Sequence, residues 1–311
     1  METGAFIISI LFAALRAGTP LLIVTLGEIL AEKVGVLNLG LEGMMLMGAL
    51  SGFVAAYVTS DPWVGMMAAM LVGGLMALLH AFVTVTLRAN QVVSGLAITL
   101  LGTGLSAFLG PKWVGKLGPE FASINIPIVS DIPYIGPILF RHDPPVYIGL
   151  LLVPIIWIWL NKTRPGLHMR LVGENPASAD TAGINVELQR YIYVVIGGML
   201  AGLAGAVLSL SYTPGWKDWM TAGRGWIGIG LVIFAMWNPL RAAFGAFLFG
   251  AVSALQFGAQ IQGINVSIFF LQMMPYLFTL VALASVSHDA VRKQIAMPSA
   301  LLTPYKRGER G

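Results

Sequence analysis

Long apolar runs recur along the whole chain, separated by short charged or turn-rich breaks. Most of the runs are long enough to cross about 30 Å of hydrocarbon as a helix. Because a bilayer interior satisfies no backbone polar groups, such runs span it as helices. The pattern predicts an all-α, polytopic membrane bundle of about nine spans, within a range of eight to ten. The spans are expected near residues 6–26, 38–59, 63–87, 91–110, 146–161, 190–211, 225–237, 242–258 and 267–286.

The seventh run, "GWIGIGLVIFAMW", differs from the others in length and glycine content. It is short for a full crossing, so we expect a broken or tilted span there.

Composition supports a membrane protein and excludes several classes of site. The chain is 57% hydrophobic and 10% charged, with a mean hydropathy of +0.82, whereas a soluble protein is about a quarter charged. No soluble catalytic domain fits in the loops, so residues 1–311 are expected to form one transmembrane domain. The N-terminus lacks the features of a cleaved signal, so the first run is expected to stay as a span. The absence of Cys excludes disulfides and thiolate sites, and the four His show no metal-ligand spacing.

The distribution of Lys and Arg predicts the orientation of the spans. With a cytoplasmic C-terminus, twelve of the 18 basic residues lie inside and five lie outside, while Arg16 falls within the first run. Basic residues near span ends favour the cytoplasm. We therefore expect an external N-terminus, an external loop at 111–145, a cytoplasmic loop at 162–189 and a cytoplasmic tail at 287–311. The modest net charge of +4 is attributed to topology and lipid contact, and no nucleic-acid partner is expected.

The cytoplasmic loop contains the capping signals of a short helix. Asn175 followed by Pro176 predicts an N-cap and a first helical residue, and Gly183 predicts a left-handed C-terminal position. A helix of about two turns is unstable alone and must be held by neighbouring protein. The small residues of this helix would let the surface of a partner protein approach closely. An interfacial helix without a partner would show the same capping signals.

Small residues spaced four apart indicate close helix packing. Gly198 and Gly202, and also Ala201 and Gly205, fall on one helical face in "GGMLAGLAGAVLSL". Channels, carriers and membrane enzymes share this feature, so it predicts a tight bundle and no particular function.

The sequence lacks the motifs with which a membrane protein would itself hydrolyse ATP, catalyse a reaction or couple transport to ions. No G-x-x-x-x-G-K-[ST] occurs, so any ATP must be hydrolysed by another chain. No His-Glu-x-x-His, nucleophile elbow or clustered aspartates lie in the spans, which argues against a membrane enzyme. Few charges follow residue 42 within the spans, which weakens the alternative of an ion-coupled carrier.

Five ordered motifs resemble one family. "GEILAEKVGVLNLGLEGMMLMGA", "NQVVSGLAITLLGTGLS", "GENPASADTAGINV", "GRGWIGIGLVIFAMWNPLRAAFGAFLFG" and "MMPYLFTLVAL" cover nearly the full chain. They resemble ABC-importer permeases of the branched-chain amino acid and simple-sugar superfamily, and more narrowly the branch for nucleosides and related purine compounds.

This resemblance implies a type II importer-like assembly in a bacterial or archaeal cytoplasmic membrane. Two permease subunits, often non-identical in this branch, would form the pore above two ATPase subunits, and an extracytoplasmic binding protein would deliver the solute. This chain would bind no cofactor, with ATP and Mg held by the ATPase. The resemblance also assigns a coupling helix that docks on the ATPase, with the residues Glu174, Asn175, Pro176, Ala177, Ser178, Ala179, Asp180, Ala182 and Gly183.

Polar residues inside or beside the spans are candidates for the solute path. Asn38 and Glu42 lie four apart on one helical face, and their groups suit nucleoside hydroxyls and ring nitrogens. Alternatively, Glu42 braces a broken helix and Glu32 with Lys33 marks the membrane edge. The remaining candidates, for which the membrane edge or helix-to-helix bonding are alternatives, are Asn90, Gln91, Ser94 and Gln256.

The ligand and the energy source leave alternatives open. Sugar permeases typically carry an Asp-Leu-Ser version where this chain has Asn38-Leu39-Gly40, which favours a nucleoside over ribose, galactose or riboflavin. A secondary carrier that needs no ATPase partner is the alternative from another class.

Overall fold

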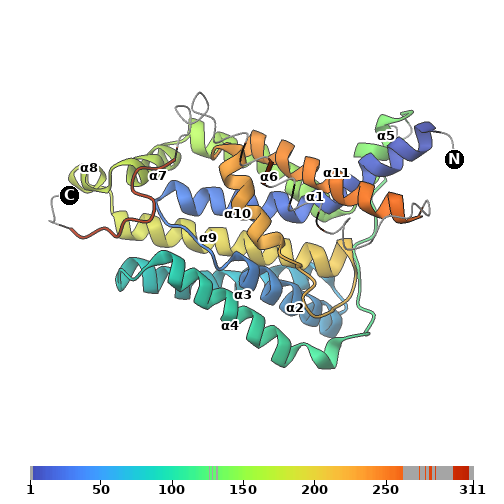
Figure 1. Ribbon diagram of the computed structural model, residues 1–311, viewed down its shortest axis with the longest axis horizontal. Helices are drawn as coiled ribbons and strands as arrows, with labels where there is room; N and C mark the ends of the chain where they lie inside the picture. Colours follow the sequence, from blue (N-terminus) through green and yellow to red (C-terminus); the bar gives the residue numbers. More distant parts are fainter. Residues whose placement is uncertain are drawn as a thin grey trace.

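The computed structural model describes residues 3–125, 127, 129–130, 132–261, 273, 277, 280–281, 284 and 297–307. Within these residues the chain forms helices and no strands, in an elongated bundle with the two termini at opposite ends (Figure 1). The elements are α1 (Thr3–Lys33), α2 (Leu41–Thr59), α3 (Pro62–Ala81), η1 (Phe82–Thr86), α4 (Gln91–Leu109), η2 (Pro111–Trp113), α5 (Ile135–Leu139), α6 (Pro144–Lys162), α7 (Arg164–Glu174), α8 (Pro176–Thr181), α9 (Val186–Val207), η3 (Leu208–Tyr212), α10 (Arg224–Ala235) and α11 (Pro239–Ile261).

Seven of the described helical segments are long and apolar enough to cross a membrane, so this is a multi-pass membrane protein. They are α1, α2, α3 with η1, α4, α6, α9 with η3, and α11. The expected short span at 225–237 corresponds to α10, which has 12 residues. The span expected at 267–286 lies outside the described residues apart from isolated positions, so the count of nine stays a prediction.

The predicted close packing is confirmed around α9, the most buried of the described spans. A Cβ on Gly202 would collide with the carbonyl of Ala69 in α3, and one on Gly198 would collide with Ala77. A Cβ on Gly205 would collide with the carbonyl of Met45 in α2. The glycines therefore let α9 approach α2 and α3 at backbone distance, which is how helices associate in lipid.

Polar N-caps start several helices at the bundle ends. Asp61 accepts a hydrogen bond from the Trp63 N–H at 2.8 Å, and Pro62 begins α3. The side chains of Asn90 and Asn185 accept in the same way from Val93 and Leu188. These bonds satisfy donors that every helix start leaves free.

Two differences from the predicted pattern concern α1 and α7. The first helix runs from Thr3 to Lys33 rather than over 6–26, because protein groups inside the bundle satisfy its polar residues. The loop at 162–189 contains α7 before the predicted short helix. Thr163 caps α7 by accepting a hydrogen bond from the Gly166 N–H at 3.2 Å. The sequence of α7 is polar and contains no hydrophobic run from which a helix could be predicted.

Candidate functional site

The chain between α1 and α2 is unwound over residues 34–40. Gly35 has a φ of +84°, a conformation that favours glycine, and its N–H donates to the Glu32 carbonyl at 2.9 Å. Non-helical backbone is stable at membrane depth only where protein satisfies its polar groups. The partners of this segment therefore define the site.

Side chains from α3 and α4 provide several of these partners. Gln91 accepts from the Leu37 N–H at 2.8 Å and donates to the Gly35 carbonyl at 3.2 Å. His80 Nε2 lies 3.1 Å from the Leu37 carbonyl and must donate to it, and His80 Nδ1 lies 3.0 Å from the Ser94 hydroxyl. Thr99 donates to the Leu39 carbonyl at 2.8 Å. The unwound segment is thus held from one side by a buried polar network.

Two carboxylates of α1, one helical turn apart, hold the other side. Glu28, fully buried, accepts from the Asn38 N–H at 2.8 Å, and its second oxygen has no partner. Glu32 is 2% exposed and accepts from the Trp237 indole N–H at 2.7 Å. Glu32 therefore does not mark an exposed membrane edge, because it ties α1 to the chain after α10.

Asn38 stabilises the start of α2. Its side-chain oxygen accepts from the Gly40 N–H at 2.9 Å, and its amide nitrogen lies 3.5 Å from the Met44 sulfur. The residue is fully buried. In this conformation its hydrogen-bonding groups are directed at protein.

Glu42 connects the first break to a second one. Its Oε1 accepts from the Thr221 hydroxyl at 2.6 Å and from the Gly223 N–H at 2.9 Å, while Oε2 accepts from the Gly225 N–H at 2.7 Å. Gly223 and Gly225 form the start of α10, the short helix that follows the irregular residues 213–223. A carboxylate at a helix N-terminus accepts hydrogen bonds from the free N–H groups there. Its negative charge also interacts favourably with the positive end of the helix dipole. This geometry is that of a brace between two broken spans.

The candidate solute-path residues therefore divide into two groups. Asn38, Glu42, Gln91 and Ser94 are buried together around residues 34–40. Asn90 is exposed at the start of α4, and Gln256 is half-buried in α11. Contact of any of them with solute stays a prediction. Sequence reasoning missed Glu28, His80 and also Arg190, which donates to the Val34 carbonyl, as parts of this site. An ionisable residue within a span is itself a functional signal.

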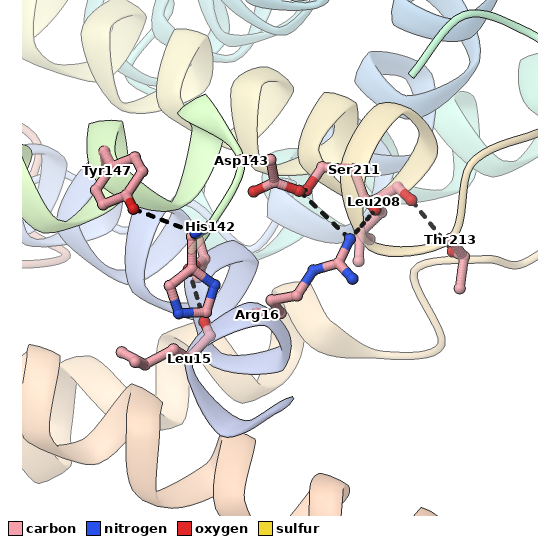
Figure 2. A network of polar contacts seen from close by, with 9 residues as sticks. Leu15, Arg16, His142, Asp143, Tyr147, Leu208, Ser211 and Thr213 are labelled. Atoms are coloured by element: carbon pink, nitrogen blue, oxygen red, sulfur yellow. Dashed lines mark hydrogen bonds and ion pairs between the residues drawn. The ribbon is translucent and has the colours of Figure 1, made fainter. Parts of the chain in front are cut away.

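At the N-terminal end of the bundle, a charged cluster joins three elements (Figure 2). Arg16 of α1 contacts the Asp143 carboxylate at 3.3 Å and donates to the Ser211 carbonyl of η3 at 2.7 Å. The Ser211 hydroxyl donates to Asp143 at 2.5 Å. His142 stacks on Phe12 with ring centroids 4.5 Å apart, and burial lowers its pKa below the ordinary value. The cluster holds α1, the start of α6 and η3 together.

At the opposite end, the loop at 162–189, which is expected to be cytoplasmic, has the predicted local geometry. Pro176 begins α8, and the Asn175 side chain accepts from the Ser178 N–H at 2.9 Å. Gly183 has a φ of +82°, which confirms the predicted left-handed position. Ala179 is buried against the bundle. The small residues left exposed on α8 and its C-terminal end are Ala177, Ser178, Ala182 and Gly183.

Comparisons with known proteins identify the class. A family model described as branched-chain amino acid transport system / permease component matches residues 10–283. A putative glucose ABC transporter permease protein of Haloferax volcanii is 41% identical, over 97% of this chain and 99% of the relative. A nucleoside ABC transporter permease protein of Lactococcus lactis is 37% identical over 86% of this chain and 88% of the relative. A guanosine ABC transporter permease protein of Bacillus subtilis is 34% identical over 96% of both.

The three organisms each contain a second, more distant relative of this chain, named as a glucose, nucleoside or guanosine ABC transporter permease protein. No solved structure matches the chain. Because the family model covers most of the sequence and relatives align over nearly its full length, this chain belongs to the family of permease components of branched-chain amino acid transport systems.

Proposed function

We propose that this chain is the membrane permease subunit of an ABC importer that carries a nucleoside or related purine-type solute. The observation that carries the ligand class is the similarity to two relatives named for nucleoside and guanosine, at 37% and 34% identity over most of their length. The Asn38-Leu39-Gly40 sequence at the first helix break agrees with that branch.

A simple sugar is the second candidate. The relative with 41% identity is named as a putative glucose permease, and it covers 97% of this chain. The two solutes share hydroxyl groups that a buried Asn or Gln can bind as donor and acceptor. The protein contacts around residues 34–40 do not separate the two ligand classes.

The proposed assembly contains this single transmembrane domain, a second permease subunit, separate ATPase subunits and an extracytoplasmic binding protein. The pairs of relatives in one organism support two non-identical permeases. The assembly would lie in the cytoplasmic membrane with the C-terminus inside. ATP and Mg would be bound by the ATPase, and this chain would be non-catalytic.

The proposed mechanism is alternating access between two sides of the membrane. ATP binding and hydrolysis in the partner would move α8, whose exposed small residues suit close docking. The spans would then tilt, with the breaks at 34–40 and 213–223 as the points where helix direction changes. Glu42 lies in the first turn of α2, directly after the first break, and it bonds Thr221 and Gly225 at the second break, so it would keep the two breaks moving together.

Uptake measurements test this proposal. Cells with and without the gene would be given labelled guanosine, glucose, ribose and riboflavin, before and after ATP depletion. ATP-dependent uptake of guanosine alone supports the nucleoside importer. ATP-dependent uptake of glucose alone would mean that the transported solute is a sugar. Uptake that survives ATP depletion, or transport by the purified chain alone in liposomes, would make it a partner-free carrier and overturn the importer.

A further inference from the structure

The C-terminal residues 297–307, here called the strap, lie against the cytoplasmic loop. The Ala300 N–H donates to the Gly173 carbonyl at 2.8 Å, and the Ser299 hydroxyl donates to Glu174 at 2.9 Å. Both partners belong to the end of α7, directly before α8. In Figure 1 this dark red segment passes α7 and the adjacent ends of α1 and α9.

The same strap contacts the start of the unwound segment through Arg190 of α9. Arg190 is 2% exposed; its Nε donates to the Val34 carbonyl at 3.2 Å and its Nη1 donates to the Thr303 carbonyl at 3.3 Å. One guanidinium thus holds the first residue after α1 and the middle of the strap. Its Nη2 is buried without a hydrogen-bond partner, so the group has a donor left for a second arrangement.

The backbones of the strap, of the segment after α1 and of the end of α7 are closely packed against one another. A Cβ on Gly35 would lie 3.0 Å from the Ala300 carbonyl and 3.2 Å from Arg190 Nη2. A Cβ on Gly173 would collide with the carbonyl of Lys33 at the end of α1. Because backbones touch here, a displacement of the strap must displace the segment that follows α1.

The far end of the strap reaches α8 itself. Arg307 pairs with Asp180 at 3.1 Å, and Tyr305 lines a groove of about 360 Å3 beside Gly183. The Arg307 side chain is 82% exposed, so this pair contributes little to stability, but it places the strap on the helix that is proposed to dock on the ATPase.

We propose that the strap and Arg190 form a transmission route from α8 to the unwound segment 34–40, with Arg190 as a positioning residue. The inference rests on the proposed function, since it requires a partner that moves α8. Movement of α8 shifts the strap, and the strap shifts Arg190. Because Arg190 bonds the Val34 carbonyl, that shift changes how the broken span is held.

Truncation of the tail tests the route. A chain ending at residue 296 lacks the strap, whereas a chain ending at residue 307 keeps it and serves as the matched control. In membrane vesicles with the ATPase and binding protein, we expect the shorter chain to lose at least about tenfold in uptake while ATP hydrolysis continues. The ratio of ATP hydrolysed to solute carried should rise, which a loss of folded protein would not produce.

Substitutions keep the test independent of folding. Arg190→Gln should raise the same ratio and Arg190→Lys should restore part of the coupling, while Arg88→Gln removes an equal charge from an exposed pair and should change nothing. The chain has no Cys, so Glu174→Cys with Ser299→Cys can be joined by a short bifunctional thiol reagent. Joining should leave uptake at the level of the same double variant before the reagent is added, because α7 and the strap move as one body.

The outcomes separate the two proposals. No ATP-driven uptake by the full chain would overturn the proposed function, and this inference with it. Normal uptake by the chain ending at residue 296, or loss of uptake on joining the two cysteines, would overturn the strap alone.

Discussion

Glu42 is the residue at which the two broken spans meet, because one carboxylate accepts three hydrogen bonds there. Glu42→Gln replaces an acceptor oxygen by an amide donor that would face an N–H or O–H group. We expect the free energy of unfolding to fall by about 2–3 kcal/mol, since a buried donor is left without a partner. Thermal unfolding in detergent measures this change.

Glu120→Gln is the matched control, because this carboxylate is exposed in the loop after α4. An unchanged melting temperature for Glu42→Gln would contradict the brace. The same variant bears on the solute path: if it folds and keeps the transport affinity and rate of the unmodified chain, Glu42 does not contact solute.

His142 gives the charged cluster at the N-terminal end of the bundle a pH dependence. Burial lowers its pKa below the ordinary value of about 6.5, despite the nearby Asp143, which opposes the shift. The unfolded chain therefore takes up a proton at a higher pH than the folded chain, so stability is lost as pH falls below about 6.5 and levels off below the folded pKa. His142→Gln should reduce the drop in melting temperature between about pH 7.5 and 5.5. His168→Gln, at an exposed position of α7, should leave that drop unchanged.

Individual residues show where sequence reasoning reaches its limit. Asn38, Glu42, Gln91 and Ser94 stand out as polar groups beside a glycine break, and the structure brings them together. Their partners could not be predicted, because spacing along one helix says nothing about which helix lies opposite. Arg190 falls at the start of an apolar run and reads there as a basic flank of the span.

The short helix α8 depends on its two ends. Asn175→Ala removes the bond to the Ser178 N–H, which is typically worth about 1 kcal/mol. Gly183→Pro cannot adopt the φ of +82° that ends the turn. Both variants should insert in the membrane normally yet lose energised uptake, whereas Asn161→Ala, at an exposed position near the end of α6, should keep it. Normal uptake by Gly183→Pro would contradict a coupling role for α8.

The packing of α9 against α3 gives a matched pair of glycines. Gly202→Val places side-chain atoms where α3 backbone lies, so the two helices must separate. Gly104 in α4 has no atoms within 4 Å of an added Cβ, so Gly104→Val should fold as the unmodified chain does. The yield of monodisperse protein in detergent should drop for Gly202→Val only; equal yields would mean that this contact is not required.

A helix could be predicted from the sequence where one local pattern determines its position. Apolar runs locate the described spans, because a membrane demands about 20 apolar residues, and glycine spacing locates the packed face of α9. A break at Gly35 was expected, but the full extent of the unwound segment 34–40, the π-helical turns of η1 and η3, and α7 were not predicted. Each of these depends on side chains contributed from elsewhere in the bundle, such as Gln91 and His80, and no local pattern contains that information.

The two ends of the helical bundle carry different structural features. The N-terminal end carries the cluster of Arg16, Asp143 and Ser211, and the other end carries α8 and the strap. The described chain begins at one end of the bundle, and residues 297–307 lie at the other end (Figure 1). The nine spans and the placement of the termini on opposite sides of the membrane stay predictions.

The orientation itself can be measured by cysteine labelling, because the unmodified chain contributes no background thiols. Leu117 is 90% exposed in the loop predicted to be external, and Leu302 is 49% exposed in the strap predicted to be cytoplasmic. A membrane-impermeant maleimide should label Leu117→Cys in intact cells and should label Leu302→Cys only after permeabilisation. The expected result follows from the excess of basic residues on the side of the strap. The reverse labelling would place α8 outside, away from any ATPase, and would overturn the proposed coupling together with the orientation.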